Sequence, residues 1–359
     1  AWPPANIPSA VPASLILAGR GNKFDPFMPK IDAGPDTGAI SLNLRDGETS
    51  AIIIDLQTTN LNLVTQEGLE AMAAQAGALD PSSDDASATL FGGLPDFVVD
   101  HYRQLYREYI RFVLAQSQPR LPAWMEEGIS QIFMRMEFSP TRIVIGKLED
   151  PNETSIGGVI EDRDFNRFLH RRKLMDLQDM FSVTADSTIA RNPLGSVWSK
   201  QSYAFVHLCL YGNNGKYQRN LLTFLSRLSQ TPPSEALFKE CFGKSYKDML
   251  MEIRGYVDFT VYKAVVFQAK KGEKMEPPSK PVFRDATEAE VGRIKGEALR
   301  MAGNKAAARD ALIAPYIRGS RDPQLLGSLG MYEFSIGETA RARKFLEAAA
   351  KAKVVRPRA

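Results

Sequence analysis

The sequence predicts an α+β protein, in which a small N-terminal β-sheet is followed by a mainly helical domain and then by an all-α module of helical hairpins. Three observations predict this architecture. Short apolar runs separated by turn residues occupy about the first 60 residues, helical spacing of apolar residues dominates from about residue 96 to 264, and a repeat marks the tail. The length of 359 residues corresponds to two or three domains.

The N-terminal part of the chain contains the strand signals. Residues 1–13 are rich in proline and alanine, which predicts an extended arm. A strand is expected at Ser14–Leu17. Two further apolar runs, Ala39–Leu44 and Ser50–Leu56, flank Asp46-Gly47, and an Asp-Gly pair between such runs predicts a β-hairpin.

The pattern then changes to helices. The polar stretch Thr58–Leu94 is expected to be a loop, and a helix of about 20 residues is expected from Asp96. A second helix is expected to have Pro122 in its first turn, where proline is well tolerated. Arg142–Lys147 is typical of a strand, and Asp164–Ala264 again has mostly helical spacing.

A change of composition predicts the domain boundary. Residues 268–285 hold three prolines and four lysines, as a solvated linker would. The predicted domains are therefore 14–267 and 286–359. From residue 268 onward the chain has 19 basic and 11 acidic residues, so the tail is basic although the whole chain carries only +3.

The tail contains an internal repeat. Ala302–Ala308 aligns with Ile336–Ala342 at an offset of 34 residues, and Gly296 aligns with Gly330 at the same offset. A period of 34 residues with small residues where helices meet resembles the tetratricopeptide repeat. The alternative is two unrelated helical hairpins.

Composition excludes several classes of function. The near-balanced charge gives no indication of a nucleic-acid partner, and no apolar run approaches the ~18 residues of a transmembrane helix. Two cysteines, Cys209 and Cys241, are too few for a disulfide framework and are expected to be free thiols. The three histidines, His101, His170 and His207, are far apart in sequence, and His207 is expected to have a structural role.

Two neighbouring segments carry a family resemblance. Arg107-Glu108-x-x-Arg111 would read His-Glu-x-x-His with histidine at both arginine positions, and 121–128 has the form Leu-Pro-x-Trp-x-x-Glu-Gly. Together with 22–27 and 201–207, these segments resemble the bacterial gluzincin-type metallopeptidases of the peptidase-MA-like group, which often carry C-terminal tetratricopeptide repeats. The resemblance implies a gluzincin-like domain over 14–267.

The departures from the family pattern predict an inactive site. In this family two neutral histidines and a glutamate hold Zn²⁺, whereas Arg107 and Arg111 have no lone pair to donate. Glu108 keeps the general-base position and Glu127 the third-ligand position, but Ser199 stands where the family has a tyrosine. Zinc is therefore expected to be absent, and these positions are expected to be vestigial.

The resemblance also places the arginines and a candidate cleft. We expect Arg107 and Arg111 to fill the space of the metal and to pair with Glu127. The alternative is a solvated basic helix face, since Arg103 continues the same row. Further candidates for lining the cleft are Trp124, Ser199 and Tyr203.

The sequence thus favours a catalytically inactive metallopeptidase-like protein that binds a protein or an extended peptide. One alternative is an active zinc peptidase that uses Glu108, Glu127 and a distant histidine such as His101 or His170. Another is a structural subunit that docks through its basic tail. Relatives of this kind are commonly exported, and Ala1 would suit a removed signal, so an extracytoplasmic location, periplasmic or secreted, is expected.

Overall fold

The computed structural model describes residues 12–19, 23–29, 39–58, 60–61, 97–98, 100–148, 160–161, 164–170, 172–191, 196–259, 264–270, 272–274 and 282–356. Most of the expected arm (1–13), most of the expected loop (58–94) and part of the expected linker (268–285) lie outside these residues. The fold is mixed α and β and mostly helical, as predicted.

The chain forms two compact units. One, here called the terminal unit, combines both ends of the chain: Ala1–Pro35, Ile40–Gln57 and Glu276–Ala359. The other, the central unit, consists of Asp36–Ala39 and Thr58–Met275. This division differs from the predicted one, because the first strands group with the tail helices and not with the domain that follows them in sequence.

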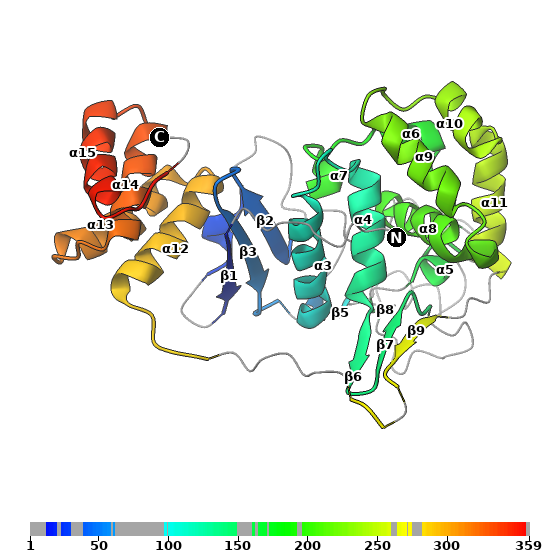
Figure 1. Cartoon of the computed structure of the whole chain (residues 1–359), viewed down its shortest axis with the longest axis horizontal. Helices are drawn as coiled ribbons and strands as arrows, with labels where there is room; N and C mark the ends of the chain where they lie inside the picture. The colour runs from blue at the N-terminus through cyan, green and yellow to red at the C-terminus, as the bar shows by residue number, and fades with distance from the viewer. Residues whose placement is uncertain are drawn as a thin grey trace, which may run out of the picture. The chain divides into compact units, whose positions relative to one another are not determined.

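The terminal unit contains a three-stranded sheet in the order β1-β3-β2 (Figure 1). Its strands are β1 (Ala13–Ala18), β2 (Ser41–Arg45) and β3 (Ser50–Asp55). The central strand β3 is buried along its whole length, parallel to β1 and antiparallel to β2. The predicted hairpin is confirmed. Its turn is stabilised by the Asp46 carboxylate, which accepts hydrogen bonds from the backbone amides of Glu48 and Thr49, both at 3.0 Å.

In the part of the terminal unit that the structure describes, four α-helices follow the sheet, and they repeat at the predicted offset. They are α12 (Glu288–Met301), α13 (Lys305–Ile317), α14 (Pro323–Ser335) and α15 (Thr339–Lys351). A Cβ at Gly296 would lie 2.4 Å from Leu312 Cγ, and a Cβ at Gly330 would lie 2.5 Å from Leu346 Cγ. In both pairs the leucine follows the glycine by the same number of residues along the chain, so the two glycines make the same close contact between helices. The sequence repeat is therefore also a structural repeat of two helical hairpins.

The central unit begins with α3 (His101–Leu114) and α4 (Ala123–Met134). The predicted start of the first helix at Asp96 is wrong, because Asp100 caps the helix by accepting hydrogen bonds from the amides of Tyr102 and Arg103. Pro122 directly precedes α4 as its N-cap, one position earlier than expected.

Among its described residues, the central unit contains two small sheets. One has the order β6-β7-β9, formed by β6 (Glu137–Ser139), β7 (Arg142–Ile145) and β9 (Val265–Gln268). The strand predicted at Arg142–Lys147 is confirmed as β7, whereas β9 was not expected. The other sheet pairs three two-residue strands in the order β4-β5-β8, namely Asn60–Leu61, Phe97–Val98 and Ile160–Glu161.

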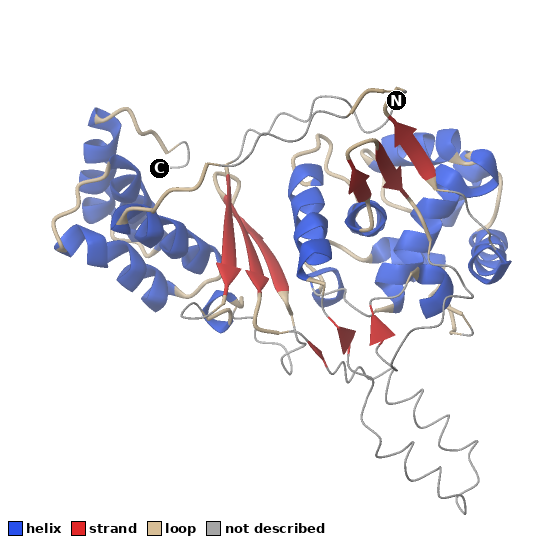
Figure 2. Ribbon diagram, turned by 90° about the horizontal axis from the view of Figure 1, so that it is seen from below, coloured by secondary structure: helices blue, strands red, loops and turns tan. Residues whose placement is uncertain are grey.

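The remaining helices of the central unit confirm the mainly helical pattern after Asp164. They are α5 (Phe165–Phe168), α6 (Leu177–Ser182), α7 (Thr188–Arg191), α8 (Val197–Tyr211), α9 (Gln218–Leu228), α10 (Glu235–Phe242) and α11 (Tyr246–Phe259). Helices make up most of the secondary structure (Figure 2). Helix α8 is almost wholly buried and packs against α4 (Figure 1). This pairing brings polar residues of α4 and α8 together inside the unit.

Two further sequence predictions concern the whole chain. Both cysteines are free, and Cys209 is buried while Cys241 is half-buried. Among the helices that the structure describes, none combines the length and apolar character needed to cross a membrane.

Candidate functional site

Helix α3 has an unusual distribution of polarity. Its buried positions include Gln104, Arg107 and Glu108, whereas Tyr102 and Tyr106 are exposed. A surface helix ordinarily turns its apolar stripe inward and its charged residues outward. Because buried charges are costly unless they are paired, the inward-facing residues of α3 require partners on the neighbouring helices.

The partner of the buried arginine is a pair of carboxylates. Arg107 donates through Nη1 to Glu108 Oε1 and through Nη2 to Glu127 Oε2, both at 2.8 Å. The three side chains are 5%, 1% and 2% exposed. A single guanidinium therefore bridges one carboxylate from α3 and one from α4, with a charge-assisted hydrogen bond to each.

The second oxygen of Glu127 is held by side chains from α8 and from α4. Ser199 Oγ donates to Glu127 Oε1 at 2.5 Å, and Gln131 Nε2 donates to the same oxygen at 2.9 Å. Lys200 Nζ in turn donates to Gln131 Oε1 at 3.1 Å. These contacts form one buried polar network across α3, α4 and α8.

The network keeps Glu127 ionised. Burial alone would raise the pKa of this carboxyl, but the positive charges of Arg107 and Arg111 and the hydrogen bonds from Ser199 and Gln131 outweigh it and lower the pKa to about 2. At neutral pH Glu127 is therefore a carboxylate facing the guanidinium of Arg107.

Arg111 lies at the edge of the network. Its Nη1 is 3.4 Å from Glu108 Oε2, and its Nη2 donates to the backbone oxygen of Ala190 at 3.1 Å. The expected pairing with Glu127 is thus found for Arg107, while Arg111 pairs with Glu108. The alternative of a solvated basic face does not hold, because Arg107 is buried. In the same row only Arg103 makes a solvent-exposed pair, with Asp100 at 3.3 Å.

Two of the three cleft candidates lie in the core. Trp124 is fully buried, with its ring centroid 5.1 Å from that of Phe181 and 5.4 Å from that of Phe205. Tyr203 is also fully buried and packs edge-on against Phe165 at 4.8 Å. Their assignment to a cleft is corrected, because both rings face the apolar interior between helices. Ser199 alone lies in the network.

Sequence reasoning missed Gln131 and Lys200. Gln131 lies one helical turn after Glu127, and Lys200 directly follows Ser199. The available signal was the helical spacing between Glu127 and Gln131, which places both side chains on one face of α4.

The histidines all have partners away from the network. Nε2 of His207 contacts the backbone oxygen of Gly146 at 3.0 Å, and its Nδ1 contacts Tyr256 Oη at 2.8 Å. Burial lowers the pKa of His207 to about 4, so the ring is neutral and serves as a structural link, as expected. His101 contacts the backbone oxygen of Thr58, and His170 contacts Asp258.

The donor set does not fit zinc. Zn²⁺ needs lone pairs from nitrogen, sulfur or oxygen, and the space between Glu108 and Glu127 is filled by the guanidinium of Arg107, which has none to give. Across the described residues, no three His, Cys, Asp or Glu side chains are grouped so that they could hold a metal ion.

The outer side of α3 presents aromatic residues to solvent. Tyr102, Tyr106 and Tyr109 follow one another at intervals of about one helical turn. The Tyr106 ring contacts the Phe138 ring of β6 edge-on, with the ring centroids 6.3 Å apart. Phe138 and Phe267 both oppose Ile143, so they share one face of the β6-β7-β9 sheet. We call this set the aromatic surface; its members are between 38% and 76% exposed: Tyr102, Tyr106, Tyr109, Phe138 and Phe267.

Comparison with known proteins adds no relative. No family model, no curated protein and no solved structure matches this chain.

Proposed function

We propose that the central unit is a catalytically silent metallopeptidase-like domain that binds a protein or an extended peptide. In this proposal α12–α15 form a short tetratricopeptide-like module attached to it in the same chain. The observation that carries the proposal is the guanidinium of Arg107 between Glu108 and Glu127. The resemblance assigns Arg107 to the first histidine position, Glu108 to the general base and Glu127 to the third ligand.

The chemistry of the site supports a lack of catalytic activity. A glutamate general base in such a site acts on a water molecule whose pKa a metal has lowered. Here Glu108 accepts hydrogen bonds from two guanidinium groups, Arg107 and Arg111, so its oxygens are engaged in ion pairs. The network therefore supports a structural task for these carboxylates, holding α3 against α4.

The aromatic surface supports binding. Tyrosine and phenylalanine are enriched at protein interfaces, where they supply large contact areas at low entropic cost. Strand β6 carries Phe138 and, within the described residues, pairs only with β7. An extended peptide added alongside β6 would find backbone hydrogen bonds there, with the ring of Tyr106 beside it.

The first test is zinc content. The wild-type chain, incubated with excess zinc and freed of unbound metal, is expected to contain almost none by plasma mass spectrometry. The Arg107→His/Arg111→His variant recreates His-Glu-x-x-His next to Glu127 and is expected to hold about one zinc per chain. A matched control, Arg103→His/Arg142→His, adds two histidines at solvent-facing positions and is expected to hold none.

Two results of the zinc measurement would contradict the proposal. One zinc per wild-type chain would overturn the proposal of a silent site, whatever the variant does. No zinc in the Arg107→His/Arg111→His variant, with its circular dichroism unchanged, would show that Glu127 is not placed as a metal ligand and would remove the metallopeptidase-like assignment.

The second test addresses binding. A random-peptide library is panned on the full chain, and the selected peptides are measured against variants. Tyr106→Ala is expected to weaken their binding at least tenfold. Phe259→Ala removes a ring at the end of α11 that is 85% exposed, against 38% for Tyr106, and is expected to leave their binding unchanged. Equal effects of both variants, or selection of no peptide, would contradict binding at the aromatic surface.

A further inference from the structure

The chain that follows α15 returns along α14. Residues 354–356 pass over Gly327, where an added Cβ would lie 3.5 Å from Val354 Cγ1 and 3.6 Å from Arg356 Cγ. These are ordinary van der Waals distances, so the segment packs closely along this part of α14. We call residues 354–356 the tail segment; its middle residue, Val355, points to solvent and is 73% exposed.

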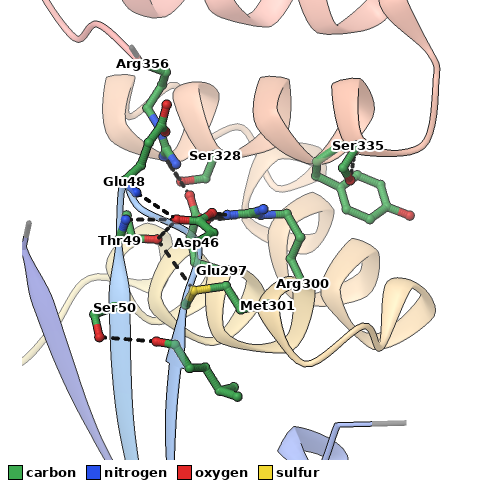
Figure 3. A network of polar contacts seen from close by, with 12 residues as sticks. Asp46, Glu48, Thr49, Ser50, Glu297, Arg300, Met301, Ser328, Ser335 and Arg356 are labelled. Atoms are coloured by element: carbon green, nitrogen blue, oxygen red, sulfur yellow. Dashed lines mark hydrogen bonds and ion pairs between the residues drawn. The ribbon is translucent and has the colours of Figure 1, made fainter. Parts of the chain in front are cut away.

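The tail segment ends in an arginine that enters a buried polar site (Figure 3). Arg356 Nε donates to Glu48 Oε2 at 2.8 Å, and Nη1 donates to Glu297 Oε1 at 2.6 Å. Nη1 also lies 3.4 Å from Ser328 Oγ. The side chains of Arg356, Glu48 and Glu297 are 10%, 5% and 6% exposed, so the guanidinium is largely removed from water.

The walls of this site are fixed independently of the tail segment. Glu48 belongs to the β2–β3 turn, which the Asp46 carboxylate holds through two backbone hydrogen bonds. Glu297 belongs to α12, and Arg300 donates to its other oxygen at 2.7 Å and also pairs with Asp46. Turn and helix therefore remain tied together when Arg356 is removed.

The charges of the site match a guanidinium. Asp46, Glu48 and Glu297 carry three negative charges, and Arg300 and Arg356 form ion pairs with them. Two carboxylates that accept from Nε and from Nη1 match the planar fork of arginine, whereas a lysine ammonium presents a single point of donation.

We propose that Glu48, Glu297 and Ser328 form a recognition site for an arginine in an extended peptide, and that Arg356 is its intramolecular occupant. This inference concerns the terminal unit alone and does not rest on the function proposed for the central unit. The tail segment inserts one side chain, that of Arg356, into this site, so a peptide of the same chemistry competes with it. Attachment in the same chain gives Arg356 the advantage of a high effective concentration.

The test uses the full chain and a fluorescent decapeptide with the sequence of residues 350–359, followed by anisotropy. Arg356→Ala, which empties the site, is expected to bind the peptide at least tenfold more tightly than the wild type does. Binding is expected to fall at least tenfold when the arginine corresponding to Arg356 in the peptide is replaced by alanine, and also when Glu297→Gln is added to the Arg356→Ala chain.

Two results would overturn the inference: equal affinity of the wild-type and Arg356→Ala chains, or equal binding of the peptide with and without this arginine. Circular dichroism establishes that the variant is folded. Should Arg356→Ala fail to fold, Arg356→Lys takes its place under the same tenfold criterion, because the ammonium retains a charge but lacks the fork. A matched control, Arg343→Ala, removes a solvent-exposed arginine of α15 and is expected to leave peptide binding at the wild-type level.

Discussion

Replacing Glu127 by alanine tests whether the buried network stabilises the central unit. The change removes the acceptor for Arg107, Ser199 and Gln131 together. Breaking a buried ion pair by deleting one partner costs about 3–5 kcal/mol, because the remaining charge is left without compensation. We expect the loss to lie in this range, with Arg107 still held by Glu108 at 2.8 Å.

The pKa of Glu127 leads to a similar magnitude. The folded-state pKa of about 2 lies below the ordinary glutamate pKa of 4.5. Each unit corresponds to about 1.4 kcal/mol, so ionised Glu127 contributes roughly 3 kcal/mol. This contribution is fully present above the unfolded-state pKa and is lost as the pH falls from about 4.5 to about 2, since the unfolded chain then binds the proton first.

The assay is urea unfolding followed by tryptophan fluorescence. Trp124 and Trp198 are both buried in the central unit, so their emission reports its unfolding. With a slope of about 2 kcal/mol per molar urea, the expected loss lowers the midpoint by about 2 M. Arg103→Ala, which breaks an exposed pair, serves as the control and is expected to change stability by less than about 1 kcal/mol.

A double variant sharpens the test. In Glu127→Ala/Arg107→Leu both members of the pair are gone. We expect this variant to recover a large part of the loss, because the guanidinium that lost Glu127 is removed and Glu108 keeps its contact with Arg111 at 3.4 Å. A Glu127→Ala chain within about 0.5 kcal/mol of the wild type would refute the reasoning that a buried, compensated pair holds α3 and α4 together.

The remaining predictions concern His207 and the repeat glycines. The pKa of His207 is about 4 in the folded chain and 6.5 ordinarily, so stability is expected to fall by up to about 3 kcal/mol between pH 6.5 and 4. His207→Gln should flatten this dependence of stability on pH. If the urea midpoint of the variant changed with pH as steeply as that of the wild type, His207 would not be its cause. Gly330→Ala places a Cβ against a leucine of α15 and is expected to cost about 1–3 kcal/mol. Gly255→Ala, whose Cβ meets nothing within 4 Å, is expected to be neutral or slightly stabilising in thermal melts.

Local signals in the sequence were sufficient for several elements. The Asp46-Gly47 hairpin follows from turn chemistry, and Gly47 has the positive φ of 89° that such a turn requires. The pairing of Gly296 with Gly330 identified the repeat, because the same contact needs the same small residue. The start of α3 was misplaced, since helical spacing continued upstream of the capping residue Asp100.

Long-range features could not be predicted. The terminal unit depends on ion pairs such as Asp46–Arg300, whose partners are 254 residues apart, and no local pattern specifies them. The motif indicated that Arg107 and Glu127 would meet, but composition alone would have placed an arginine at the surface. It also suggested a cleft position for Trp124, although a ring of this size packs equally well into a core, and neighbouring rings decide between the two.

The terminal unit is built from segments that are far apart in the chain, and this has a consequence for biosynthesis. The strands β1, β2 and β3 leave the ribosome early, whereas α12, which carries Glu297 and Arg300, follows only after the whole central unit has been translated. Closing a loop of about 200 residues costs roughly 5 kcal/mol of chain entropy, and this cost falls when the intervening residues are already folded. We therefore expect the nascent chain to fold its middle first and to complete the sheet-bearing unit last.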